Sequence, residues 1–228
     1  MQIHRQIFAL VVAALLFSSC AMIPGVVSDA RYEFDEGLAL FNSGKYREAI
    51  PKFQRATDLD PNFGRAYLYL GRSYIGLKSW RQALTPLRTA YRLSPEESKR
   101  EVLDILIDAL FAGGLDAFNS GNFESAVDYF KEILGLQPTS AKGRSEFLKA
   151  LIAHGGSSLS NGNFPQAISA YTEAVKLSPN SFDAVFGLAR AFFRNGELSK
   201  AFEAAKAAVR VEPRNPEIQS FLQELQRR

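Results

Sequence analysis

The sequence predicts an all-α solenoid of about five helix-turn-helix repeats, followed by a C-terminal capping helix. The first observation is a short pattern that recurs as LFNSGKYREAI at 40–50, AFNSGNFESAV at 117–127 and LSNGNFPQAI at 159–168. The second is a series of prolines with spacings of 34, 43, 41 and 34 residues, at positions 61, 95, 138, 179 and 213. Such self-similarity is typical of stacked repeats, because one hairpin alone cannot bury its apolar face.

Aligning the chain on these prolines defines five units, at 30–63, 64–97, 107–140, 148–181 and 182–215. Small residues occupy the two positions where the helices of a hairpin are expected to cross. At the eighth position stand Gly37, Gly71, Gly114, Gly155 and Ala189, and at the twentieth Ala49, Ala83, Ala126, Ala167 and Ala201. Four units also carry a glycine between the two helices, which fits a left-handed turn without strain. The closing proline then ends each second helix.

The units resemble the tetratricopeptide repeat over about 170 of the 228 residues. The resemblance rests on the small eighth and twentieth positions, a Tyr, Trp, Phe or Leu at the seventeenth, and the closing proline. The departures are Lys78 in place of the turn glycine, Ile133 at a small position, Ala205 at a bulky position, and insertions at 98–106 and 141–147. The resemblance implies a right-handed superhelix in which the first helix of each hairpin lines a concave, partner-binding groove.

Residues 1–19 are interpreted as a lipoprotein signal peptide. An apolar run of 11 residues at 7–17 is too short to cross a bilayer as a helix and ends in FSSC, where Cys20 is the only cysteine. The segment resembles a bacterial lipoprotein signal, which implies acylation of Cys20 and, because Ala21 follows, an outer-membrane protein facing the periplasm. The alternatives are an ordinary secretory signal or an uncleaved anchor, which would give a soluble periplasmic or inner-membrane protein.

Residues 20–29 are expected to form a short tether that carries the acylated cysteine, and residues 30–228 the repeat domain. The insertion at 98–106 continues the apolar spacing of the next helix and should lengthen it by ~2.5 turns, with Ser94 and Pro95 at its cap. The insertion at 141–147 has a capping residue in Thr139 or Ser140, although Gly143 disfavours a helix. The longer helices either help to hold a partner or pack only on the array.

The segment 216–228 is predicted to be the polar-backed capping helix that a solenoid needs at its end. Asn215 stands where an N-cap is expected, and Pro216 follows as the first helical residue. Its apolar residues form one stripe, at Ile218, Phe221, Leu222 and Leu225.

No catalytic or metal site is predicted. His154, the one histidine outside the signal, has no Cys, Asp or Glu partner at metal spacing, so it is interpreted as structural. There is no phosphate loop, nucleophile elbow or HExxH motif. The formal net charge of +3 gives no electrostatic footprint for nucleic acid. We therefore expect a protein that is not an enzyme and that uses no cofactor, metal, small-molecule substrate or nucleic acid.

The resemblance places the groove at fixed positions of each first helix. The predicted groove residues are Phe34, Phe41, Leu68, Arg72, Ile75, Phe111, Phe118, Ile152, Leu159, Phe186, Arg190 and Phe193. Further basic residues fringe this stripe, at Arg31, Arg65, Lys149 and Arg194, with acids at Asp108 and Asp183. An apolar stripe with a basic fringe fits an extended or helical apolar segment that bears acidic residues. The alternative is that these aromatic side chains pack between neighbouring repeats.

Together these features predict a lipid-anchored scaffold that binds another envelope protein through its groove, in outer-membrane or cell-wall complex assembly. The layout is similar to that of tetratricopeptide lipoproteins that act as pilotins for outer-membrane secretins or as adaptors of cell-wall hydrolases. One alternative is an accessory subunit of a glycosyltransferase or of a secretion or polysaccharide-export system. Another is direct peptidoglycan binding, for which we expect aromatic platforms beside carboxamide and acidic side chains.

Overall fold

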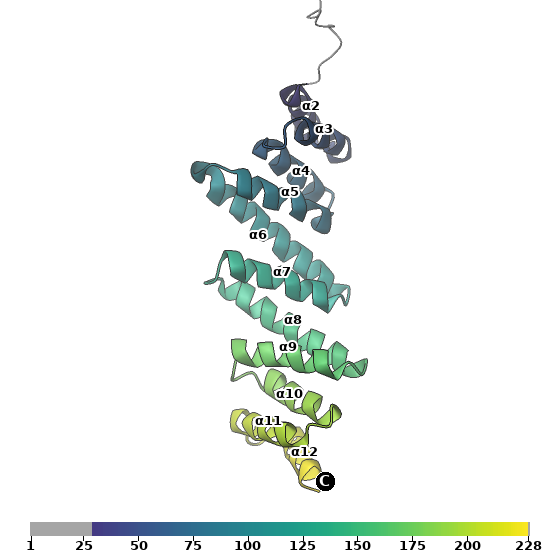
Figure 1. Ribbon diagram of the computed structural model, residues 1–228, viewed down its shortest axis with the longest axis vertical. Coiled ribbons are helices and arrows are strands. Elements are labelled where there is room, and N and C mark those ends of the chain that lie inside the picture. The colour runs from purple at the N-terminus through teal and green to yellow at the C-terminus, as the bar shows by residue number, and fades with distance from the viewer. Residues whose placement is uncertain (1–28, 228) are drawn as a thin grey trace, which may run out of the picture.

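The chain forms a stack of antiparallel helical hairpins, as Figure 1 shows. The computed structural model describes residues 29–227, and within this range there are eleven helices. The five hairpins are α2 (Ala30–Asn42) with α3 (Tyr46–Leu59), α4 (Gly64–Gly76) with α5 (Trp80–Leu93), α6 (Glu96–Asn119) with α7 (Phe123–Leu136), α8 (Ala141–Ser160) with α9 (Phe164–Leu177), and α10 (Phe182–Arg194) with α11 (Leu198–Val211). The predicted all-α solenoid is confirmed, whereas the predicted signal peptide and Cys20 lie outside the described residues.

The two helices of each hairpin cross at the small residues. The alanines at the twentieth position are fully buried, and a Cβ added to Gly71 would lie 2.5 Å from Cγ of Leu87. A Cβ at Gly114 would likewise lie 2.7 Å from Cε1 of Phe130. Real Cβ atoms do not approach other carbons so closely, so these positions are restricted to glycine by the packing across the hairpin.

The turns inside the hairpins all use a left-handed residue. Four of them carry a glycine with φ between 73° and 83°, at Gly44, Gly121, Gly162 and Gly196. In the second hairpin Lys78 takes the same conformation with φ 57°. Lysine in place of glycine therefore leaves the backbone of the turn unchanged. It costs free energy, because the Cβ of a non-glycine residue is crowded in the left-handed region.

The core runs along the stack as a series of clusters. The largest extends from α5 to α10 and includes Leu110 and Phe130, which are fully buried. Smaller clusters lie around Phe53 at the N-terminal end and around Ile218 at the C-terminal end. Most helix contacts join elements that are adjacent in the chain, which is the arrangement expected of a repeat array.

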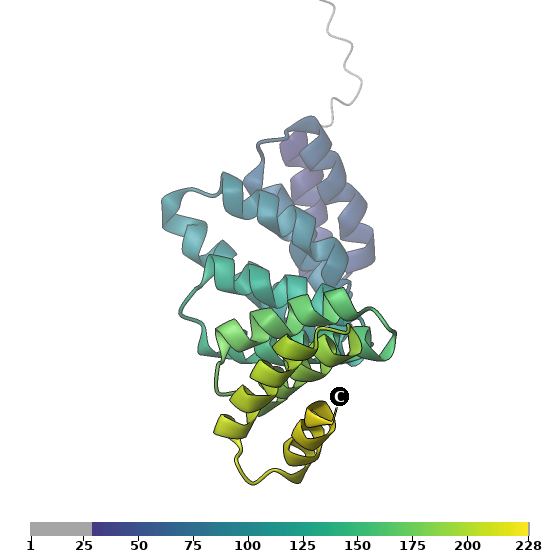
Figure 2. The same ribbon diagram turned by 60° about the horizontal axis from the view of Figure 1, so that its bottom comes forward.

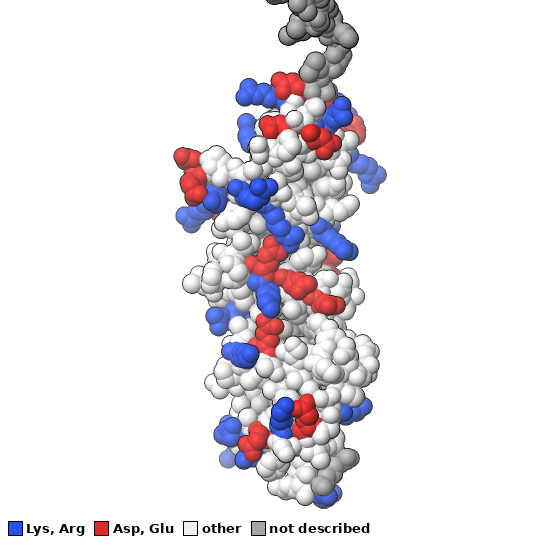
Figure 3. Space-filling view, in the orientation of Figure 1, with Lys and Arg blue, Asp and Glu red and all other residues white. Residues whose placement is uncertain are grey.

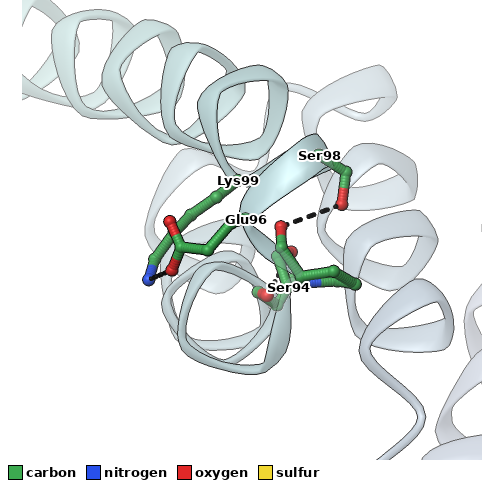
Figure 4. A network of polar contacts seen from close by, with 6 residues as sticks. Ser94, Glu96, Ser98 and Lys99 are labelled. Carbon is green, nitrogen blue, oxygen red and sulfur yellow. Dashed lines mark hydrogen bonds and ion pairs between the residues drawn. The ribbon is translucent and has the colours of Figure 1, made fainter.

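Both insertions are helical. α6 begins at Glu96, where Lys99 Nζ lies 2.7 Å from Glu96 Oε1 and the Ser98 hydroxyl donates to the carbonyl of Pro95 (Figure 4). The sequence predicts Ser94 as part of the cap of this helix, but its hydroxyl donates to Ala90 O at 2.7 Å and so closes α5 instead.

Gly143, which disfavours a helix by propensity, is buried in the first turn of α8. A Cβ at this position would lie 3.0 Å from Cγ2 of Ile133, so the close approach of α7 accounts for the glycine. Ser140 accepts a hydrogen bond from the Gly143 amide and caps the helix, as predicted.

The C-terminal end of the stack is covered by α12 (Pro216–Gln226), which Figure 2 shows in yellow at the bottom of the view. Asn215 accepts a hydrogen bond from the Glu217 amide at 3.0 Å, so it is the N-cap, as predicted. Ile218 is fully buried against α11, while the polar residues of α12 face outward. This helix covers apolar surface of the last hairpin, which a single hairpin cannot bury by itself.

The second helices are joined by ion pairs across repeats. Arg88 of α5 donates to both carboxylate oxygens of Glu132 on α7, at 2.7 and 2.5 Å. Lys131 of α7 lies 3.0 Å from Glu173 of α9. Figure 3 shows positive and negative side chains interspersed along the stack. Because these pairs are largely exposed, each contributes little stability. The main link between repeats is the packing of each second helix against the first helix of the next repeat.

We expect Gly71→Ala to destabilise the array by about 1–3 kcal/mol, because the added methyl group must displace Leu87. The matched control is Gly135→Ala in α7, where a Cβ meets nothing within 4 Å. Since alanine favours a helix over glycine, the control should be neutral or slightly stabilising. Urea unfolding followed by circular dichroism measures both variants, and equal midpoints would contradict a close crossing at Gly71.

Candidate protein-binding groove

The predicted groove residues differ in depth, and two of them belong to the core. Phe34 and Phe186 are 3% and 5% exposed, so their placement in an open groove was wrong. The ring of Phe34 lies 4.9 Å from that of Phe63, which precedes α4. The ring of Phe186 lies 5.5 Å from that of Phe221 on α12. In the first and last repeats, an aromatic side chain that follows the hairpin in sequence covers the residue at the fifth position of the first helix.

The middle of the stack covers a further set of these residues. Leu68, Phe111 and Ile152 are half-buried and pack against the largest core cluster. The ammonium group of Lys142, from the second insertion, lies 4.6 Å from the centre of the Phe111 ring. Phe118 packs edge-on against Phe123 at 5.3 Å. These side chains therefore pack within the stack and leave only part of their surface exposed.

The remaining six predicted residues line two hollows on the face formed by the first helices. The N-terminal hollow lies between α2, α4 and α6 and has a volume of about 520 Å³. Its lining residues are Phe41, Tyr46, Arg72, Ile75, Gly76, Trp80, Ile105, Asp108, Ala109 and Ala112. Ile105 comes from the first insertion, so the lengthened α6 supplies part of the wall.

Aromatic rings hold the guanidinium group of Arg72 in place in the N-terminal hollow. The guanidinium of Arg72 lies 5.4 Å from the ring centre of Phe41 and 5.2 Å from that of Tyr69. A guanidinium that stacks on rings keeps the N–H groups of its edge for a carboxylate. Gly76 is required here, because a Cβ would lie 2.5 Å from Cδ2 of Tyr46.

The C-terminal hollow lies between α8, α10 and α12 and has a volume of about 510 Å³. Its lining residues are Gly156, Leu159, Ser160, Tyr171, Arg190, Phe193, Arg194, Phe221 and Glu224. Arg190 lies 5.8 Å from the ring centre of Phe186, and Arg194 lies 5.7 Å from that of Phe164. Two exposed guanidinium groups therefore stand over aromatic rings at the edge of this hollow.

Tyr171 adds a neutral polar group to the C-terminal hollow. Burial raises the pKa of its phenol above the usual value, while the nearby charge of Arg190 acts in the opposite direction. The hydroxyl therefore stays protonated at neutral pH and can donate a hydrogen bond to a ligand.

Sequence reasoning missed Trp80, Gly156 and Phe221 as lining residues, along with Ile105. The apolar period that continues from the first insertion into α6 was the available signal for Ile105. Phe221 belongs to the predicted apolar stripe of the capping helix, and its ring also borders the hollow. The lining therefore combines first helices with the cap.

The described residues contain no group of three His, Cys, Asp or Glu side chains that could hold a metal ion. None of the helices between residues 29 and 227 is long and apolar enough to cross a membrane. The groups that the two hollows offer are apolar walls, guanidinium donors and a few hydroxyls, and these groups suit the binding of a polypeptide segment.

Stacked hairpins with hollows along their first helices define a helical-repeat scaffold for protein binding. A sequence profile of the tetratricopeptide repeat matches residues 34–98 and 152–216, which is more than half of the chain. The chain belongs to the tetratricopeptide repeat family. Proteins of this family are interaction scaffolds that bind other proteins.

The chain is similar to solved structures of repeat proteins. A tetratricopeptide repeat protein from Bacteroides fragilis NCTC 9343 is 16% identical, with 88% of this chain and 99% of that one covered and a TM-score of 0.53. YrrB, a repeat protein with an unusual peptide-binding site, is 17% identical over 86% and 92% of the two chains, with a TM-score of 0.37. No curated protein sequence matches the chain. The likeness to the Bacteroides fragilis protein supports the fold alone.

We expect Phe186→Ala to destabilise the last repeat and α12 by about 3–5 kcal/mol, because it removes a buried ring that touches Phe182 and Phe221. Arg190→Ala, one turn away on the exposed side of α10, is the control and should change stability by less than about 1 kcal/mol. Urea unfolding measures both variants. Full stability of the Phe186 variant would mean that this ring lies in the groove after all.

Proposed function

We propose that the chain is a non-catalytic, lipid-anchored scaffold of the bacterial cell envelope, which binds another envelope protein in outer-membrane or cell-wall complex assembly. The observation that carries the binding role is the pair of hollows on the first-helix face, each with a guanidinium stacked on aromatic rings. Stacking holds these groups in place before a partner arrives, which lowers the entropic cost of binding.

The chemistry of this face indicates the kind of segment that binds. Arg72, Arg190 and Arg194 present charged donors beside apolar walls, so an apolar segment that carries carboxylates complements them. A small-molecule substrate would need convergent catalytic groups, and the lining residues of the two hollows do not include a nucleophile with a general base beside it.

Support for membrane anchoring comes from the sequence alone. The apolar run at 7–17 and the following Cys20 resemble a lipoprotein signal, and the repeat domain starts ten residues later. Ten residues reach at most ~35 Å, so an acylated Cys20 would hold the array close to the membrane surface. The partner would then be another protein at the same surface, which is the basis for the proposed role in complex assembly.

A polar hollow at the edge of the stack favours direct glycan binding as a second candidate. It has a volume of about 310 Å³ and lies beside the turn at Lys78. Trp80 and Tyr129 line it together with the carboxamides of Gln82 and Asn122 and the carboxylate of Asp116. Aromatic, carboxamide and acidic side chains are the set expected for peptidoglycan, so binding to purified sacculi is a necessary arm of any partner search.

We expect Cys20→Ser to abolish acylation and to release the protein from the membrane fraction, since the thiol is the only acyl acceptor of its kind in the chain. Metabolic labelling with an alkyne fatty acid, followed by membrane fractionation, measures both effects. Labelling and fractionation that are unchanged from the parent protein would exclude the lipoprotein assignment.

We expect the double variant Arg72→Glu with Arg194→Glu to lose capture of its envelope partner by at least tenfold, because a carboxylate in the partner would meet like charge. The matched control reverses two exposed arginines of α3, with Arg47→Glu and Arg55→Glu. In-cell cross-linking and quantitative mass spectrometry compare the two. If both variants capture the partner equally, the first-helix face is not the binding site.

A further inference from the structure

The polar hollow at the edge of the stack, which we call the edge hollow, has a volume of about 310 Å³. It is bounded by the turn at Lys78, the start of α5, the last two turns of α6 and the start of α7. Trp80 is the one lining residue that it shares with the N-terminal hollow of the groove. Sites for small molecules measure roughly 300–1,000 Å³, so the edge hollow fits a single ring better than a long segment of polypeptide.

Two half-buried aromatic side chains, Trp80 of α5 and Tyr129 of α7, supply apolar faces to the edge hollow. Both lie against Gly113 of α6, where an added Cβ would be 3.3 Å from Cβ of Trp80 and 3.6 Å from Cε2 of Tyr129. Aromatic side chains of this kind offer an apolar face beside a polar edge. A sugar ring matches them, because its C–H groups form an apolar face and its hydroxyls lie around the rim of that face.

The polar part of the lining offers both donors and acceptors of hydrogen bonds. Oδ1 of Asn122 accepts from the Ser125 amide at 3.2 Å, which leaves the NH2 group of Asn122 as a donor. The carboxylate of Asp116 is an acceptor, and the carboxamide of Gln82 can act in both ways. Each hydroxyl of a sugar also donates and accepts, so this mixture suits a sugar better than it suits an apolar ligand.

Lys78 and Arg81 give the edge hollow a surplus of positive charge, because Asp116 is the one carboxylate in its lining. In the described part of the chain, no residue forms an ion pair or a side-chain hydrogen bond with Lys78 or Arg81. Arg88, two turns further along α5, is instead paired with Glu132. The charged ends of Lys78 and Arg81 are therefore available to a carboxylate of a ligand.

Lys78 also marks the place where the second hairpin departs from the repeat. The other four hairpins have glycine at this turn, whereas Lys78 has φ 57° and a crowded Cβ. Residues held in such conformations are concentrated at sites where the strained residue contributes to function. Glycine would relieve the strain but would remove the ammonium group from the edge hollow. The strain is therefore accounted for if this ammonium group binds a ligand.

We propose that the edge hollow binds a sugar unit that carries a carboxylate. The sugar ring packs on Trp80 and Tyr129. Its carboxylate lies beside Lys78 and Arg81, and Asp116 accepts hydrogen bonds from its hydroxyls. This inference rests on the glycan-binding candidate of the proposed function and is independent of the protein-binding groove. The same chemistry occurs in the N-acetylmuramic acid of peptidoglycan and in the uronic acids of other polysaccharides.

The test compares two matched pairs of sugars for binding to the full chain. N-acetylmuramic acid differs from N-acetylglucosamine by a lactyl group that carries the carboxylate, and glucuronic acid differs from glucose by a carboxylate in place of a hydroxymethyl group. Trp80 is the only tryptophan of the sequence, so its fluorescence reports binding, and saturation-transfer NMR of each sugar provides a second measurement. We expect at least one acidic sugar to bind roughly tenfold more tightly than its neutral counterpart, because charge-assisted hydrogen bonds are the stronger ones. The acidic sugar with the higher affinity distinguishes peptidoglycan from other polysaccharides as the source.

Lys78→Gly separates the loss of binding from a loss of folding. The variant should lose most of the preference for the acidic sugar, while its urea midpoint stays the same or rises, because glycine adopts the left-handed turn without strain. Arg81→Ala should reduce the same preference. Arg47→Ala, at the equivalent position of the first repeat, is the matched control and should change neither affinity. Arg72→Glu should also leave sugar binding unchanged, which excludes the N-terminal hollow as the source of the Trp80 signal.

The outcomes separate this inference from the proposed function. Equal affinity for the acidic and the neutral sugar of both pairs overturns the inference and leaves direct glycan binding as a candidate. If none of the four sugars binds, the inference and the glycan candidate are both overturned. Tighter binding of acetyl-Asp-Glu-amide than of either acidic sugar also overturns the inference, and assigns the edge hollow to an acidic polypeptide. The protein-binding groove is tested separately, by partner capture with the Arg72 and Arg194 double variant.

Discussion

The structure depends on the close crossing of two helices within each hairpin. At Gly71 the backbone of α4 lies against Leu87 of α5, and at Gly114 the backbone of α6 lies against Phe130 of α7. A side chain of one helix fills the space that a Cβ would occupy on the glycine of the other helix. This close packing fixes how the two helices of the hairpin lie relative to each other. The same contact recurs in four of the five hairpins, at Gly37, Gly71, Gly114 and Gly155, and the fifth has the small Ala189 at this position, so similar crossings set the direction in which the first helices face.

The hollows follow from this regularity and from the places where it is broken. A regular array would present similar surfaces in every repeat. Here α6 is lengthened by the first insertion, which brings Ile105 to the N-terminal hollow, and the single helix α12 follows the fifth hairpin and brings Phe221 to the C-terminal hollow. The elements that depart from the repeat are therefore those that distinguish the two sites chemically.

The fold could be predicted from the sequence because repeat positions determine it locally. Small residues at the crossing and a left-handed turn act within one hairpin, and even the substitution of Lys78 for glycine leaves φ in the same region. The depth of a groove residue could not be predicted in this way. Phe34 and Phe41 lie at the fifth and twelfth positions of one helix, yet Phe34 is covered by Phe63 from the following loop while Phe41 borders a hollow. The exposed fraction of a groove side chain depends on which residue of a neighbouring element packs on it. Its position in the repeat does not determine that residue.

Arginine connects the core to the binding face. The rings of Phe186 and Phe41 pack in T-shaped pairs within the stack, and the guanidinium groups of Arg190 and Arg72 lie 5.8 and 5.4 Å from their ring centres. A lysine could supply the charge but not the planar stacking and the fixed fork of donors. The aromatic residues of the first helices stabilise the packing of the stack, and they also hold the arginines that we propose bind a partner's carboxylate.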